Sequence, residues 1–190
     1  FLPISSTGHL ILAHEFIGLD PQSFQNAFDV CIQLGAILAV VVLYFKKLWP
    51  FKKEEGKVVA EKDTFMLWLK VVVGVIPSAV LGFLFDDFID EHLFKPQVVA
   101  ATLIIYGILI LVIENRNEGK HLKAKVSRVE NIPYAMAFAI GLFQCLAMVP
   151  GTSRSAATIL GALLLGASRG AAAEFSFFLA IPTMFGATLL

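Results

Sequence analysis

The residues best suited to chemistry lie in a hydroxyl-rich loop with a single arginine, set between two apolar segments. The loop reads Pro-Gly-Thr-Ser-Arg-Ser over residues 150–155 and is followed by Thr158. A guanidinium offers forked donors to phosphate oxygens, and nearby hydroxyls add further hydrogen bonds. An arginine at the centre of a membrane helix costs roughly 2.5 to 3.5 kcal/mol, so its presence indicates function. The pattern predicts a phosphate site with Arg154 as anchor and Ser153, Ser155 and Thr158 as further ligands.

A second loop, near the N-terminus, carries a histidine three residues after a serine. It reads Pro-Ile-Ser-Ser-Thr-Gly-His over residues 3–9, which places Ser6 and His9 within reach of each other on one turn. An imidazole beside a hydroxyl can act as general acid or base for a nucleophile. Together the two loops predict phosphoryl chemistry on a lipid. The alternative is that the histidine is structural and the hydroxyls bond to the backbone.

The composition predicts an integral membrane protein. Hydrophobic residues make up 57% of the chain, 17 residues are Phe, charged residues are 16%, and the mean hydropathy is +0.78. Lys plus Arg and Asp plus Glu are 15 each, which argues against nucleic-acid binding. Cys31 and Cys145 lie in apolar runs without metal-ligand spacing. The chain starts at Phe1 and ends within an apolar run, so we expect a piece of a longer protein.

Four apolar segments are predicted to span the membrane, at residues 27–45, 65–85, 97–113 and 172–190. The loop between the first two is rich in lysine, the next loop is acidic, and residues 114–133 are again basic. Positively charged loops stay in the cytoplasm, so the first and third of these loops are expected there and the second outside. Lys70 lies near one end of its segment, where it can snorkel to water, and Glu174 is expected at the cytoplasmic interface beside Arg169.

The two limbs around the arginine loop, residues 134–149 and 159–167, are short for two full crossings. They predict a re-entrant hairpin over residues 134–169, entering from the cytoplasm and turning near mid-membrane. In the competing interpretation residues 134–149 cross fully and the loop lies at the external face.

An internal repeat favours the hairpin. An offset of 147 residues aligns Pro3 with Pro150, Ser6 with Ser153 and Phe28 with Phe175. Each hydroxyl-rich loop is then followed, at the same distance, by a Phe that opens an apolar span. The predicted fold is an all-α polytopic membrane protein with inverted-topology repeats. It forms a single membrane domain over residues 1–190, with residues 1–26 as part of the first hairpin.

Taken together, the loops at residues 1–9 and 150–158 resemble the bacterial undecaprenyl-diphosphate phosphatase family, known for bacitracin resistance. The resemblance covers nearly the whole chain, including Glu-Phe-Ser-Phe at 174–177. It implies hydrolysis of undecaprenyl diphosphate in the bacterial inner membrane for peptidoglycan synthesis. It also implies a site open to the periplasm, a divalent cation such as Mg or Ca, and a homodimer.

By the same resemblance, Ser6 is the nucleophile, His9 transfers protons and Arg154 anchors the diphosphate, while the other hydroxyls of both loops support them. These are Ser5, Thr7, Ser153, Ser155 and Thr158. The family pattern has Glu-x-x-x-Glu immediately before Phe-Leu-Pro, and this sequence begins at that Phe. The isolated 190-residue segment is therefore expected to be inactive.

The main alternative is a transporter or flippase of polyprenyl phosphate or another anion, because broken helices and an intramembrane Arg also suit a carrier. A carrier has no need of a nucleophile and base, so the pairing of Ser6 with His9 favours the enzyme. The other lipid-phosphatase superfamily ranks lower, because its further basic and His-containing motifs are not found here.

Overall fold

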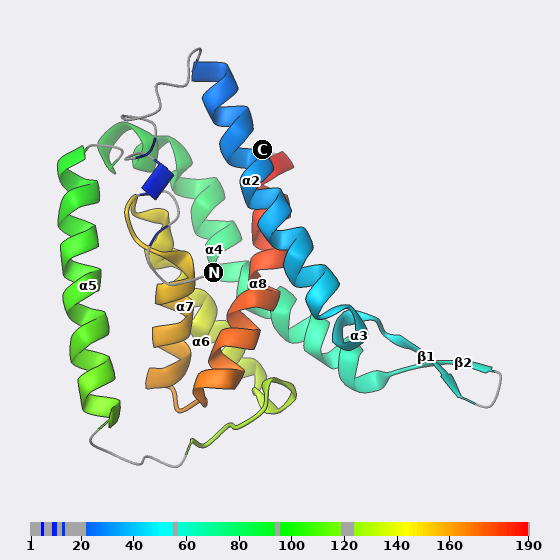
Figure 1. Ribbon diagram of the computed structural model, residues 1–190. Helices are drawn as coiled ribbons and strands as arrows, with labels where there is room; N and C mark the ends of the chain where they lie inside the picture. The colour runs from blue at the N-terminus through cyan, green and yellow to red at the C-terminus, as the bar shows by residue number, and fades with distance from the viewer. Residues whose placement is uncertain are drawn as a thin grey trace.

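The described part of the protein is almost entirely helical. The computed structural model describes residues 5, 9–10, 13, 22–54, 57–93, 96–118 and 124–189. The long helices are α2 (Gln22–Leu43), α4 (Lys62–Leu93), α5 (Pro96–Glu118), α6 (Tyr134–Cys145), α7 (Arg154–Leu164) and α8 (Arg169–Leu189). Short turns are α3 (Phe45–Leu48), η1 (Val129–Asn131) and η2 (Leu146–Met148). The predicted all-α class is confirmed, with one small exception (Figure 1).

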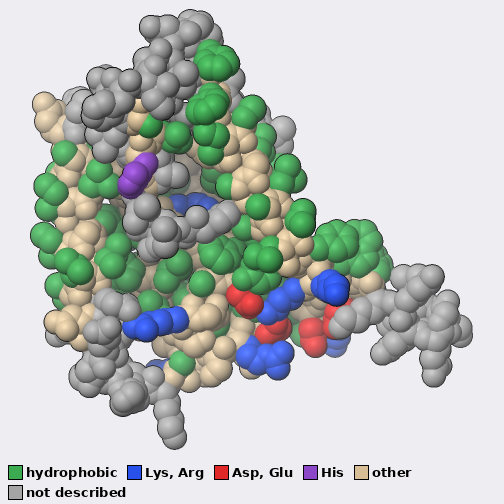
Figure 2. All heavy atoms as spheres, in the orientation of Figure 1, with side chains coloured by type: hydrophobic (Ala, Val, Ile, Leu, Met, Phe, Trp, Pro, Cys, Tyr) green, Lys and Arg blue, Asp and Glu red, His purple; other side chains and the backbone are tan. Residues whose placement is uncertain are grey.

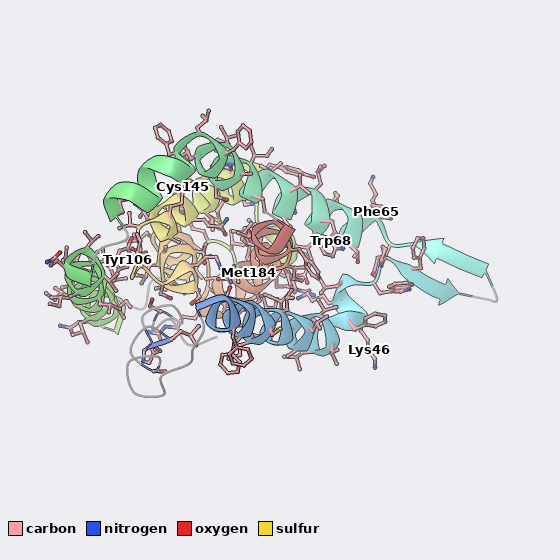
Figure 3. The ribbon with its side chains drawn as sticks, turned by 90° about the horizontal axis from the view of Figure 1, so that it is seen from above. Lys46, Phe65, Trp68, Tyr106, Cys145 and Met184 are labelled. Carbon is pink, nitrogen blue, oxygen red and sulfur yellow. The ribbon has the colours of Figure 1, made fainter. Side chains whose placement is uncertain are left out.

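The exception is a two-stranded antiparallel hairpin in the segment expected to be a loop. Strand β1 (Phe51–Glu54) pairs with β2 (Lys57–Ala60), with Phe51 opposite Ala60 and Glu54 opposite Lys57. Val58 and Val59 are β-branched residues that favour extended backbone. Figures 1 and 3 both show the hairpin projecting sideways from the helices.

Helix α8 forms the centre of the bundle and contacts α2, α4, α7 and η1. Its Phe175 and Phe178 side chains are completely buried and contribute the largest apolar surfaces of the core. Tyr44, at the end of α2, meets Phe178 edge to face with ring centroids 5.3 Å apart. This packing fixes the end of α2 on the side of α8.

The helices α4 and α6 cross with almost no space between their backbones. A Cβ added to Gly141 of α6 would fall on the carbonyl oxygen of Gly74 in α4. A Cβ at Gly74 would in turn lie 2.8 Å from Leu179 Cδ1 of α8. Glycine at both positions therefore sets the spacing of the three central helices.

The described helices differ in their capacity to span a membrane. Only Lys62–Phe85, within α4, is both long and apolar enough by length and composition, while other apolar helical stretches are shorter. Those stretches are Cys31–Leu43, Gln97–Ile113, Tyr134–Met148 and Arg154–Leu164. Large apolar side chains on several helices are nonetheless exposed, including Phe83, Leu43 and Leu111. An apolar surface of this kind is suited to contact with lipid.

One end of the bundle is joined by an ion cluster centred on Lys47. Its Nζ lies 2.7 Å from both Glu130 Oε1 in η1 and Glu174 Oε2 in α8. Glu174, expected beside Arg169 at the interface, is thus paired with a lysine from the α3 turn. Lys70 does not reach water as expected: it is only 8% exposed, and its Nζ donates to the carbonyl oxygen of Glu130 at 2.7 Å.

The pKa values of this cluster are shifted in the direction that keeps it charged. Burial alone would lower the pKa of Lys47, but hydrogen bonds and charges from Glu130 and Glu174 outweigh it and raise the pKa above 10.5. Burial alone would raise the pKa of Glu130, but bonds and charges, chiefly from Lys47, lower it below 4.5. Both partners are about one-third exposed, which limits the pair to about 1 kcal/mol.

We expect Lys47→Met to lower the melting temperature of the detergent-solubilised protein by a few degrees. The Lys47 contribution is fully present below its ordinary pKa of 10.5 and is lost as pH rises through the raised value. The Glu130 contribution is present above its ordinary pKa of 4.5 and is lost as pH falls through the lowered value. The difference between wild type and variant should therefore be largest between pH 4.5 and pH 10.5. Lys46→Met at the exposed neighbouring position is the control, and a pH-independent difference would contradict the assignment.

Candidate active site

The arginine loop lies at the tip of a helical hairpin formed by α6 and α7. At the other end, the backbone N–H of Ser168 donates to Val126 at 2.8 Å and that of Lys125 donates to Gly166 at 2.9 Å. The chain after α7 therefore returns to the segment just before α6. The α6–η2 limb has 12 plus 3 residues and α7 has 11, about 22 and 16 Å of helix. Both limbs fall short of the roughly 30 Å of a bilayer core.

Helix α5 holds the loop in place. The Thr102 hydroxyl donates to the carbonyl oxygen of Pro150 at 2.7 Å. Gly151 has φ 89°, and a Cβ there would collide with the Thr102 hydroxyl and lie 2.7 Å from the Val99 carbonyl oxygen. Only glycine meets both the left-handed conformation and the close approach of α5.

Ser153 begins α7 as its N-cap. Its Oγ accepts a hydrogen bond from the Ala156 N–H at 3.2 Å and lies 3.1 Å from Ser155 Oγ. The remaining N–H groups of the first turn and the positive end of the helix dipole favour an anion here. Ser153 and Ser155 lie at this helix end, and their role as phosphate ligands stays a prediction.

Arg154 supplies a buried donor at the same helix end. Its Nη1 atom is shielded from solvent and has no hydrogen-bond partner among the described residues. Thr152 Oγ1 is also buried in this region, close to the side chain of Tyr106 in α5. A buried donor without a partner is costly, so the arrangement favours an anionic ligand. Figure 2 shows a hollow in this face with a basic side chain at its base and a histidine near its rim.

Thr158 is placed differently from the other predicted ligands. It is completely buried, and its hydroxyl donates to the Arg154 carbonyl oxygen at 2.9 Å and lies 2.6 Å from Ser176 Oγ of α8. These bonds join α7 to α8 directly below the arginine. Its role as a phosphate ligand stays a prediction.

In the first loop, the structure describes Ser5 and His9, while Ser6 and Thr7 lie outside the described residues. Ser5 is buried and has φ 62°, a left-handed conformation that is uncommon for serine and frequent at functional sites. His9 Nδ1 lies 2.9 Å from the Ser5 carbonyl oxygen. Because a carbonyl only accepts, Nδ1 carries the hydrogen, and in the neutral ring Nε2 is left as the basic nitrogen.

The geometry thus provides a helix end suited to an anion and an imidazole whose Nε2 can take a proton. A family profile, described as bacitracin resistance protein BacA, matches residues 1–190. The chain belongs to the BacA family.

Named relatives align with the whole chain at high sequence identity. The undecaprenyl-diphosphatase of Lachnoclostridium phytofermentans is 62% identical over 191 residues, covering 100% of this chain and 68% of the relative. That of Enterococcus faecalis is 56% identical, covering 99% of this chain and 68% of the relative. That of Fusobacterium nucleatum is 56% identical and covers 100% and 71%.

The divalent cation implied by the resemblance to the BacA family finds no site in the described part of the chain. There, no three His, Cys, Asp or Glu side chains are placed to hold a metal ion. The described residues therefore do not fit a cation site on their own, and the cation stays a prediction.

A buried glutamine, Gln144, links three helices of the bundle. Gln144 Nε2 donates to Ser78 Oγ at 2.6 Å and to Thr183 Oγ1 at 3.3 Å. It thereby joins α6 to α4 and α8, next to Pro77 and Pro182, which lie inside those helices. Its Oε1 is buried without a partner among the described residues. The only sequence signal was a polar residue within an apolar segment.

Proposed function

We propose that this protein hydrolyses undecaprenyl diphosphate to undecaprenyl phosphate and inorganic phosphate, recycling the lipid carrier of peptidoglycan synthesis. The observation that carries the proposal is the match of the whole chain to the BacA family, with 62% identity to a protein named undecaprenyl-diphosphatase. The buried, unpartnered Nη1 of Arg154 at the N-terminus of α7 supports it, because a diphosphate supplies the missing acceptor.

In the proposed reaction, Arg154 and the first turn of α7 bind the diphosphate and stabilise the charge on the terminal phosphoryl group. The Ser6 hydroxyl attacks the terminal phosphorus while His9 Nε2 takes its proton. The bond from that phosphorus to the bridging oxygen breaks, and undecaprenyl phosphate leaves. Water then attacks the phosphoserine, releasing phosphate and restoring Ser6. In the alternative, water oriented by Ser6 attacks directly and His9 accepts its proton.

The proposed setting is the bacterial inner membrane, crossed several times, with the site open to the periplasm. The short limbs of the α6–α7 hairpin support a loop near mid-membrane. The lysines around α3 support a cytoplasmic location for the end of the bundle that contains α3. Inverted repeats, a homodimer and a requirement for Mg or Ca belong to the same proposal.

The decisive experiment measures phosphate release from undecaprenyl diphosphate by the purified full-length protein in detergent. Release with saturation kinetics supports the enzyme. A carrier of polyprenyl phosphate would instead move intact lipid between the leaflets of vesicles without releasing phosphate, and that result would reject the proposed reaction.

We expect Ser6→Ala and His9→Ala each to reduce phosphate release by about a hundredfold or more, since proton transfer alone contributes 10²- to 10⁴-fold. Binding of the lipid diphosphate should change little, because Arg154 remains. Ser127→Ala, at an exposed serine near the opposite end of the hairpin, is the matched control and should keep wild-type rates. Unchanged hydrolysis in both loop variants would exclude the assigned nucleophile and base.

A further inference from the structure

An exposed aromatic row runs from the end of the α2–α3 segment into the hairpin. The rings of Phe45 and Trp49 stack with centroids 5.3 Å apart, and Trp49 meets Phe51 at 5.9 Å. All three side chains are about half exposed, at 50%, 50% and 46%. We refer to Phe45, Trp49 and Phe51 as the aromatic row. Phe45 and Trp49 stack, Trp49 and Phe51 meet edge to face, and the neighbouring Leu48 enters the core.

The aromatic row sits on a fixed base. The Trp68 indole N–H of α4 donates to the Leu48 carbonyl oxygen at 3.1 Å. The Glu61 N–H donates to the Pro50 carbonyl oxygen at 2.7 Å, closing the foot of the hairpin, and Lys47 is held by its two carboxylates. Three contacts therefore anchor the segment that carries the row.

Basic residues flank the aromatic row. Residues 46–62 contain six lysines and three glutamates, and the lysines are Lys46, Lys47, Lys52, Lys53, Lys57 and Lys62. Lys47 is neutralised by its partners, whereas Lys46 points outward from α3 (Figure 3). Figure 2 shows a hydrophobic patch at the foot of the hairpin directly beside basic side chains. The hairpin projects sideways in both ribbon views, across the long axes of most helices (Figures 1 and 3).

We propose that the aromatic row and the lysines of residues 46–62 other than Lys47 form a binding surface for anionic phospholipid headgroups. Aromatic side chains prefer the boundary between headgroups and acyl chains, where one part of the ring is apolar and the other wet. Lysines placed at the same depth attract anionic headgroups, each by about 1 kcal/mol. A hairpin that extends sideways from the helices keeps strands β1 and β2 along the bilayer surface. This inference goes beyond hydrolysis and requires only that the helices lie in the membrane.

The test uses full-length protein reconstituted into vesicles that contain phosphatidylcholine or phosphatidylglycerol with brominated acyl chains. Subtracting the fluorescence of Trp49→Phe from that of wild type isolates Trp49. We expect brominated lipid to quench Trp49, aqueous iodide to quench it poorly, and brominated phosphatidylglycerol to be preferred several-fold over brominated phosphatidylcholine. Replacing Lys46, Lys52 and Lys53 by Gln should remove most of that preference, while Lys125→Gln outside the patch should retain it.

Two results would overturn the proposal. Free access of iodide to Trp49 without quenching by brominated lipid would place the row in water. Quenching that does not distinguish the two lipids would exclude recognition of anionic headgroups. Phosphate release by the same variants in detergent is expected to be unchanged, so loss of lipid preference and failure of the proposed hydrolysis are distinguished.

Discussion

Replacing Arg154 by alanine is expected to reduce phosphate release from undecaprenyl diphosphate by about 10²- to 10³-fold, the usual cost of removing a donor that stabilises charge in the transition state. Its Nη1 is buried without a partner in the described structure. Burying this charged group therefore costs the ligand-free protein free energy, and only a bound anion offsets that cost. The same variant should therefore keep or raise the melting temperature of the ligand-free protein. Kinetics and thermal unfolding in detergent measure the two effects.

Two further variants sharpen this expectation. Arg154→Lys keeps the positive charge but loses the paired N–H donors of the guanidinium, so it should retain only part of the wild-type activity. Arg169→Ala removes an exposed arginine at the other end of the hairpin and should keep wild-type rates. If Arg154→Ala lowered the melting temperature, and if Arg154→Ala and Arg169→Ala lost activity equally, Arg154 would have a structural role only.

The paired helices around the arginine loop were predictable because their signals are local. Pro150 and Gly151 interrupt an apolar run, and the limbs on either side are too short to cross a bilayer. The N-cap at Ser153 also follows from a serine placed before an apolar helix. In contrast, the β-hairpin was expected to be a loop, because its lysines and glutamates mask a short run of β-branched residues.

The contacts between distant segments were not predictable from one sequence. Lys47 and Glu174 are 127 residues apart, and nothing in their local patterns indicates that they meet. Lys70 was expected to reach water, but η1 folds over it and offers a carbonyl oxygen instead. Thr158 carries the same hydroxyl as Ser153 and Ser155, yet it is one turn further along α7, where the helix faces α8. Residue type indicated the chemistry, whereas helix packing decided which hydroxyl groups remain available to bind a ligand.

Gly141→Ala is expected to destabilise the protein by about 3 kcal/mol, the upper end of the usual cost of overpacking. The added Cβ would fall on the carbonyl oxygen of Gly74, and backbone cannot rotate away as a side chain can. Helices α4 and α6 would have to separate, which also loosens the contact of Gly74 with Leu179 of α8. At about 2–4 °C per kcal/mol for a chain of this size, we expect the melting temperature to fall by roughly ten degrees.

Gly107→Ala in α5 is the matched control, because a Cβ there meets nothing within 4 Å. Since alanine is the better helix former by about 1 kcal/mol, this variant should be as stable as wild type or slightly more stable. Helix α6 leads directly into the arginine loop, so Gly141→Ala should also displace Arg154 and reduce phosphate release below its melting temperature. Equal stability of the two glycine variants would mean that α4 and α6 are not in backbone contact, and the position assigned to the loop would then have to be revised.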